Sequence, residues 1–276
     1  MPDISLRRIA LLGCGAMGTR IARAIDSGGI NAVLTHVYDQ APERSKGLVD
    51  SLKTKPIIVE NTHLLSSNNT NLVVEAASQD AVKDVALSVI QNKKDLLIMS
   101  VGALLDEAIF EVLADACREY GRSIYLPSGA IAGIDALRAV RGELESVTLT
   151  TTKNPRSLSG VPYIEQSGVD LGSLDGPAEV FAGTAADAVR HFPANINVAA
   201  LIDVACAGGG STKVRIVADP SIDRNIHEVR ASGGFGSMII RVENVPDPDN
   251  PRTSLLAALS AIERIRGLCS GGIMAG

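Results

Sequence analysis

The segment Gly13–Gly18, which reads Gly-Cys-Gly-Ala-Met-Gly, has the spacing of a phosphate-binding turn. The first glycine permits a tight turn, the second has no Cβ to keep a pyrophosphate from the backbone, and the third lets a helix lie close to a sheet. A helix beginning here offers unpaired N–H groups and the positive end of its dipole to a phosphate. The turn therefore predicts a dinucleotide site that includes Gly13, Gly15, Ala16, Met17 and Gly18.

An acidic residue, Asp39, follows the glycine turn at the distance expected for a ribose ligand, at the end of the next predicted strand. A carboxylate there can accept both ribose hydroxyls of an adenosine, and it repels a 2′-phosphate. The cofactor is therefore expected to be NAD. Arg44 lies nearby in the sequence and can meet a phosphate, so NADP stays possible.

Among the four histidines, His227 is the one whose surroundings suit acid–base chemistry. On the predicted strand 225–231 it shares one face with Val229 and Ala231, so the imidazole points toward an apolar interior or cleft. Such a histidine is more often a packed core residue than a catalyst. The polar run Asp223–Asn225 just before His227 weakens the preference for a core role, but the core role stays favoured on these residues alone. His36, His63 and His191 are interpreted as structural, loop and helix-end residues.

The glycine turn requires a strand before it and a helix after it, and the sequence predicts both. Ile9–Leu12 is an apolar run of strand length, and apolar residues recur at helical spacing from Met17 to Ile25. A second strand, Ala32–Tyr38, then ends on Asp39. Agreement of strand, turn, helix and terminal acid favours dinucleotide binding over a plain structural turn.

Strands and helices keep alternating up to residue 126. Further helices are expected at 42–52, 81–90 and 104–120, and further strands at 56–59, 71–77, 95–99 and 123–126. This alternation predicts a parallel sheet covered on both faces, with ligands beyond the carboxyl ends of its strands. Ala77, Ser100–Gly102 and Pro127–Ala130 are therefore expected at the same edge as the glycine turn.

From about Ser128 the pattern changes to α+β. Strands are expected at 146–153, 178–182, 213–218, 225–231 and 235–242, and helices at 131–140, 185–191 and 196–206, the last two capped by Thr184 and Asn195. Gly208–Gly210 should end the third of these helices, residues 154–176 should form a long loop, and residues 246–251 a connector. A final helix, 255–268, is long enough to pack back on the first domain.

The predicted fold class is α/β, with an amino-terminal Rossmann-type, doubly wound parallel sheet, a second α+β domain and a carboxyl-terminal helix that returns to the first domain. We expect residues 1–127 plus 252–276 to form the dinucleotide-binding domain. Residues 128–251 are expected to form the substrate, catalytic and oligomerisation domain.

Composition narrows the class of protein. The chain has 276 residues, 46 % hydrophobic and 21 % charged, with a net charge of −5 and no basic block, so nucleic-acid and anionic-membrane partners are not indicated. No apolar run approaches the ~18 residues that a membrane helix needs, and nothing resembles a signal peptide. The four cysteines lack metal-ligand spacing, so no metal site is expected. They are expected to be reduced thiols in a cytoplasmic protein.

Five segments together resemble the L-aspartate dehydrogenase family, and the resemblance covers nearly the whole chain. They are Leu12–Gly18, Val74–Ser78, Pro127–Gly133, Phe192–Ala199 and Ala218–Glu228. The last two, which read FPANINVA and ADPSIDRNIHE, are the specific ones.

The resemblance implies oxidation of L-aspartate with NAD or NADP to iminoaspartate, which feeds NAD biosynthesis or hydrolyses to oxaloacetate and ammonia. It implies that His227 is the catalytic residue and that Ala130 and Asn197 contact the cofactor. It also implies a dimer or larger homo-oligomer. With it, the catalytic interpretation of His227 becomes the favoured one.

Other interpretations remain open at this point. One is a different Rossmann reductase of similar layout, such as a dihydrodipicolinate reductase or homoserine dehydrogenase, although the lysine-containing signatures of those enzymes are absent. Another is a non-catalytic NAD-sensing protein. The cation that binds the substrate carboxylates is also open, because Lys153, Lys213, Arg215 and Arg224 are equal candidates.

Overall fold

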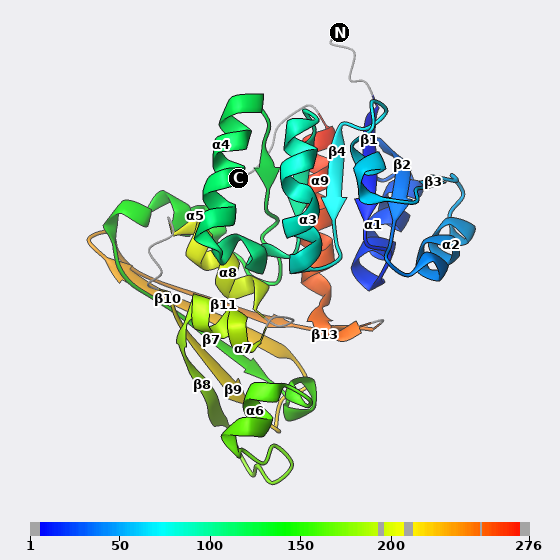
Figure 1. The fold of residues 1–276 in the computed structure, drawn as a ribbon. Helices are drawn as coiled ribbons and strands as arrows, with labels where there is room; N and C mark the ends of the chain where they lie inside the picture. The colour runs from blue at the N-terminus through cyan, green and yellow to red at the C-terminus, as the bar shows by residue number, and fades with distance from the viewer. Residues whose placement is uncertain (1–5, 193–195, 207–211, 249, 271–276) are drawn as a thin grey trace. The chain divides into compact units, whose positions relative to one another are not determined.

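The computed structural model describes residues 6–192, 196–206, 212–248 and 250–270 (Figure 1). The chain divides into two compact units, one of Met1–Pro127 with Ala258–Gly276 and the other of Ser128–Ala257. Asn195 and Gly208–Gly210, expected to begin and end a helix, lie outside the described residues. Within the described residues, no helix combines the length and apolar character needed to cross a bilayer.

The first unit is built on a six-stranded parallel sheet with the order β3-β2-β1-β4-β5-β6. Its strands are β1 (Arg7–Leu12), β2 (Ala32–Tyr38), β3 (Ile57–Ile58), β4 (Leu72–Glu75), β5 (Asp95–Ile98) and β6 (Ile124–Tyr125). The order reverses between β1 and β4, so the carboxyl ends of these strands form the switch point at which such sheets bind ligands. The predicted doubly wound parallel sheet is confirmed.

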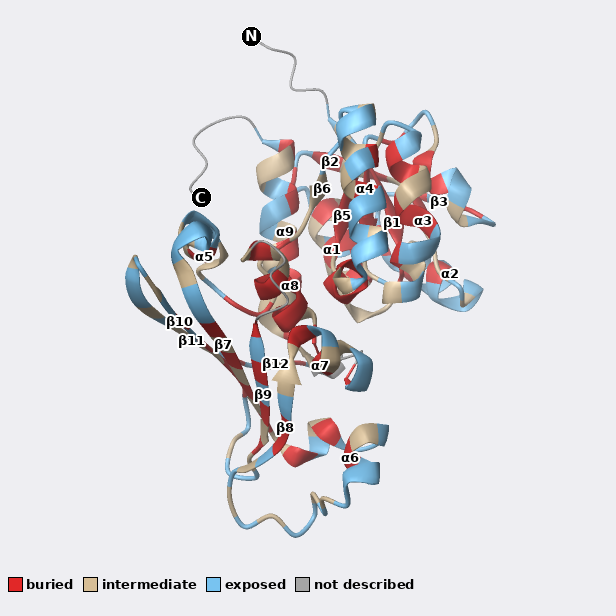
Figure 2. Cartoon of the chain, turned by 60° about the vertical axis from the view of Figure 1, so that its left-hand side comes forward, coloured by how far each residue is buried: buried red, intermediate tan, exposed pale blue. Residues whose placement is uncertain are grey.

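Both faces of this sheet are covered. Ile9, Ala10 and Leu11 are fully buried although successive side chains of a strand point to opposite faces (Figure 2). The helices are α1 (Ala16–Asp26), α2 (Pro42–Ser51), α3 (Gln79–Gln91), α4 (Glu107–Tyr120) and, from Ala258 onward, α9 (Leu255–Cys269). Ala261 and Ile265 of α9 belong to the same core as Ile9 and Leu11, so the final helix returns to the first unit as predicted.

The long helix expected from residue 104 is shorter than predicted. Val101–Leu105 forms a 3₁₀ helix, η2, and α4 begins after Asp106, whose carboxylate accepts the Ile109 N–H at 3.3 Å. This carboxylate cap satisfies a first-turn donor and separates the two helices. Gly121, in the left-handed conformation at φ 61°, ends α4 as predicted. A second 3₁₀ helix, η1 (Thr62–Ser66), precedes β4.

The second unit contains a five-stranded mixed sheet with the order β11-β10-β7-β9-β8. Its strands are β7 (Leu144–Lys153), β8 (Ala178–Thr184), β9 (Lys213–Ala218), β10 (Asn225–Gly233) and β11 (Gly236–Asn244). Every neighbouring pair is antiparallel except β7 and β9. Along β7, Val147, Leu149, Thr151 and Lys153 are buried and alternate with partly exposed residues, so one face of the sheet is covered and the other is open.

Short helices complete the second unit. They are α5 (Ile134–Ala139), α6 (Pro162–Ser167), α7 (Ala185–His191), α8 (Asn197–Ala205) and the 3₁₀ turns η3 (Arg141–Glu143) and η4 (Pro155–Leu158). Thr184 caps α7 as predicted, in a reciprocal bond pattern with Asp187. The helix expected from residue 131 begins instead at Ile134, because Gly133 adopts φ 69° and interrupts the helical conformation.

Two segments expected to be irregular are ordered. Residues 154–176 contain η4 and α6, and the Tyr163 ring of α6 packs against Phe181, His191 and Phe192, with centroid distances of 5.7, 4.3 and 5.5 Å. These aromatic contacts, which join residues far apart in the sequence, hold the segment on the sheet. The expected connector 246–251 pairs instead as β12 (Pro246–Asp247) with β13 (Asn250–Ser254).

Candidate active site

The glycine turn follows β1 and lies against β4. Gly13 has φ 98°, and a Cβ there would stand 2.4 Å from the Ala76 carbonyl oxygen. A Cβ on Gly18 would stand 1.9 Å from the Gly13 carbonyl oxygen. These two glycines are therefore required by the packing of the turn itself, as the motif predicts.

Gly15 differs from the other two glycines. A Cβ there would meet no protein atom within 4 Å, and its backbone at φ −72° suits any residue. The residue precedes α1, whose amino terminus has no side-chain cap bond, and Gly15, Ala16 and Met17 are partly exposed. Unpaired N–H groups beside a space that a Cβ would narrow fit the pyrophosphate of a dinucleotide.

Asp39 fixes this turn to the end of β2. Its Oδ2 accepts the Cys14 N–H at 2.7 Å, and its Oδ1 accepts the Ala41 N–H at 2.9 Å. Each carboxylate oxygen retains a second lone pair, which suits the two hydroxyls of a ribose. Burial raises the pKa of the Cys14 thiol to about 11, which suits a small packing residue and not a nucleophile.

Sequence reasoning missed Glu75, although it lies in one of the segments that carry the family resemblance. This fully buried carboxylate ends β4, accepts the Ala77 N–H and the Ser100 hydroxyl on Oε1, and accepts the Met99 and Ser100 N–H groups on Oε2, all at 2.7–3.1 Å. Burial raises its pKa, while the four donors oppose that shift. Glu75 therefore holds the turns after β4 and β5, including Ala77, which is exposed as a cofactor contact requires.

The second unit places His227 on the covered face of its sheet, as the alternation predicts. The side chain is 4 % exposed, and Nδ1 lies 3.0 Å from Oγ1 of Thr151, the residue directly opposite on β7. Burial and the positive charge of Lys153 lower the pKa of His227 to about 3. The imidazole is therefore neutral at neutral pH.

Three more polar side chains are buried at the same end of this sheet. Lys153 is the last residue of β7, and Asn225 and Asn244 are paired across β10 and β11; all three are 3–4 % exposed. Asn244 donates to the carbonyl oxygen of Ala130 at 2.9 Å, which ties the Ala130 turn to the strand beside His227. The alternation along β7, which continues from Thr151 to Lys153, is the feature of the sequence that places Lys153 on the buried face.

The other predicted site residues fall into two groups. The glycine turn, Asp39 and Ala77 lie together in the first unit, at the carboxyl ends of β1, β2 and β4. Ala130 and Asn197 lie in the second unit with His227, and Asn197 is the first residue of α8. Among the described residues there is no group of three His, Cys, Asp or Glu side chains placed to hold a metal.

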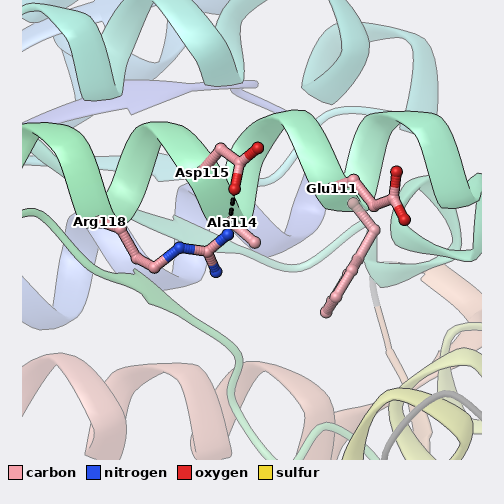
Figure 3. Close-up of a pocket in the computed structure, with 5 residues that line it drawn as sticks. Glu111, Ala114, Asp115 and Arg118 are labelled. Atoms are coloured by element: carbon pink, nitrogen blue, oxygen red, sulfur yellow. Dashed lines mark hydrogen bonds and ion pairs between the residues drawn. The ribbon is translucent and has the colours of Figure 1, made fainter.

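The remaining histidines have structural surroundings. His36 is buried in β2, with Nδ1 3.0 Å from the Thr35 hydroxyl, and His191 ends α7 against Tyr163. A shallow hollow on α4 also lacks the features of an active site (Figure 3). It is lined by residues of that one helix, and Arg118 and Asp115 form an exposed ion pair there.

Two family models match consecutive parts of the chain. Residues 135–268 match the family model described as aspartate dehydrogenase, C-terminal, and residues 13–127 match that of the homoserine dehydrogenase NAD binding domain. An L-aspartate dehydrogenase of Nitrosopumilus maritimus is 59 % identical, over 98 % of this chain and 100 % of the relative. One from Methanococcoides burtonii is 46 % identical, over 94 % and 96 %.

The fold is similar to that of a solved relative as well. The crystal structure of an aspartate dehydrogenase from Thermotoga maritima superposes with a TM-score of 0.78 at 29 % identity, covering 98 % of this chain and 99 % of the other.

The three glycines give a first test of the cofactor site. Gly15→Ala should leave the melting temperature nearly unchanged, because its Cβ meets no protein atom, and should weaken NAD binding by about tenfold or more. Gly18→Ala should lower the melting temperature, since its Cβ meets backbone. Calorimetric titration with NAD and thermal unfolding measure the two effects. If a folded Gly15→Ala variant bound NAD as tightly as the wild type, the assignment of the pyrophosphate to this turn would be wrong.

The buried imidazole predicts a loss of stability in acid. The folded-state pKa of His227 is about 3, below the ordinary 6.5, so the unfolded state binds more protons as the pH falls from 6.5 toward 3. The free energy of unfolding should therefore fall by up to about 1.4 kcal/mol per pH unit on this account. Urea unfolding at pH 7 and pH 5 should show a smaller loss in His227→Gln than in the wild type. His63→Gln, which changes an exposed histidine, is the control, and equal losses in all three proteins would contradict the prediction.

Proposed function

The chain belongs to the L-aspartate dehydrogenase family, and from this premise we propose that it catalyses the NAD-dependent oxidative deamination of L-aspartate. The products are NADH, ammonia and oxaloacetate, with iminoaspartate as the intermediate that water hydrolyses. One observation carries the proposal: in a chain 59 % identical to a protein named L-aspartate dehydrogenase, a buried histidine is held by Thr151 on the covered face of the second sheet.

The reaction needs a proton acceptor beside the substrate amine. NAD, when bound, accepts the hydride from the aspartate Cα. The hydride can leave only after the amine has lost its extra proton, because the nitrogen lone pair must form the C=N bond. In the tautomer in which Nδ1–H of His227 donates to Thr151 Oγ1, Nε2 carries the lone pair that takes this proton or activates the attacking water.

The remaining site residues are assigned to the cofactor. The N–H groups around Gly15 hold the pyrophosphate. Asp39 accepts hydrogen bonds from the hydroxyls of the adenosine ribose, which favours NAD. Arg44 is exposed on α2 and can meet a 2′-phosphate, so NADP use stays open. We assign Ala130 and Asn197 to the nicotinamide half of the cofactor. Residues 1–127 with 252–276 then serve as the dinucleotide-binding domain, and residues 128–251 as the substrate domain.

Removal of the imidazole tests this mechanism. General acid–base catalysis typically contributes about 10²–10⁴ in rate, so His227→Ala should lower kcat by that factor and leave NAD affinity nearly unchanged. NADH formation from L-aspartate measures kcat, with homoserine as the control substrate for a different Rossmann enzyme. His36→Ala serves as the control for loss of a buried histidine outside the site. Near-normal turnover in His227→Ala would remove His227 from the mechanism. If the wild-type protein oxidised homoserine and did not oxidise L-aspartate, the proposed activity would be overturned.

We also propose that the enzyme is a cytoplasmic homo-oligomer whose iminoaspartate feeds NAD biosynthesis. The four cysteines are free thiols in the structure, which suits a reducing compartment. The strands β8 and β11 are the edges of the second sheet, and such edges suit pairing with another copy. Light scattering of the purified protein should give a mass of at least twice 28.8 kDa, and a mass of one chain would contradict the oligomer.

A further inference from the structure

The substrate of the proposed reaction carries two carboxylates, so its pocket needs a cation. Lys213 and Arg215 are exposed on β9, and Arg215 lies 2.5 Å from Glu179. Arg224 is exposed next to Asp223, 3.9 Å away. Among the four cationic candidates, Lys153 is the one buried on the face of the sheet that carries His227.

The strand register fixes how near Lys153 and His227 are. His227 pairs with Thr151, so Lys153 is the diagonal neighbour of His227 on the same face, because residues i and i+2 of a strand share a face. Diagonal neighbours of an antiparallel pair lie within reach of long side chains. The charge of Lys153 contributes to the low pKa of His227, which agrees with this proximity.

The surroundings of Lys153 suit a bound anion. Its neighbour on β9 is Ala218, which is fully buried, and Asn225 shares its face on β10. Burial lowers the pKa of Lys153 to about 8, so its amine is still mostly protonated at pH 7. Attraction between an ammonium and a carboxylate is stronger away from bulk water than on an exposed surface.

We propose that Lys153 binds a carboxylate of the amino-acid substrate beside His227. This assignment rests on the proposed function, because it takes His227 as the group that serves the substrate amine. A carboxylate on Lys153 orients the substrate relative to the imidazole. It also offsets the positive charge that lowers the proton affinity of His227, so substrate binding makes the imidazole a better proton acceptor.

The test removes the charge of Lys153 and keeps a side chain of similar length. Lys153→Met should raise the KM for L-aspartate by about 10² or more, with NAD affinity within twofold of the wild type. Lys153→Arg should recover part of this loss because it restores a cation. Lys213→Met, which removes an exposed lysine from the opposite face, is the matched control and should behave as the wild type.

Binding of succinate separates this proposal from the proposed activity. Succinate has two carboxylates and no amine, so its affinity for the NAD-bound protein reports on the carboxylate site without turnover. Lys153→Met should lose about tenfold or more of that affinity, whereas His227→Ala should lose kcat and keep most of it. Folding of Lys153→Met is judged by its NAD affinity. If the folded variant kept the wild-type KM for L-aspartate and the wild-type affinity for succinate, the role of Lys153 would be overturned. If Lys153→Met does not fold, wild-type affinities in Lys153→Gln would do the same.

Discussion

The turns at the carboxyl ends of the parallel sheet depend on carboxylates that accept backbone N–H groups. Asp39 joins the glycine turn to the end of β2, and Glu75 joins the turns that follow β4 and β5. Turn amides beyond the last strand pairing, such as those of Cys14, Ala77 and Ser100, need side-chain acceptors or water. A buried carboxylate with several N–H donors satisfies them and fixes the backbone at the same time.

This constraint explains why the proposed cofactor site in the first unit is built mostly of backbone. Gly13 and Gly18 bring the turn and α1 so close that a Cβ at either position would meet a carbonyl oxygen. Gly15 leaves the space beside the helix amino terminus open. The side chains that define this part of the site therefore act by holding main-chain N–H groups in place, and in the proposed cofactor site Asp39 is the residue assigned to the ribose.

The second unit uses side chains where the first uses backbone. Alternation along β7 and β10 brings Thr151, Lys153, Asn225 and His227 to one end of one sheet face, where all four are buried. Burial has a direct chemical consequence there, because it lowers the proton affinity of both the imidazole and the lysine amine. Under the proposed function, a substrate carboxylate bound to Lys153 would offset the positive charge that lowers the proton affinity of the imidazole. The bond from Asn244 to Ala130 links this group to a turn assigned to the cofactor.

The sequence by itself determined the features that rest on local pattern. Strand and helix periodicity identified the doubly wound sheet, the glycine spacing identified the turn, and alternation along 225–231 placed His227 on a covered face. Short-range chemistry also located Gly121 at the end of α4 and Thr184 at the start of α7.

The tertiary structure decided what depends on residues far apart in the chain. The four cations were equivalent in sequence. The structure separated Lys153 from the others, because the pairing of β7 with β10 puts it on the buried face beside His227, whereas the other three are exposed. Glu75 became recognisable only when β5 brought Met99 and Ser100 beside β4. The same reason applies to α6, whose order comes from the rings of Phe181 and Phe192, and to the low pKa of His227, which comes from burial and from a lysine on another strand.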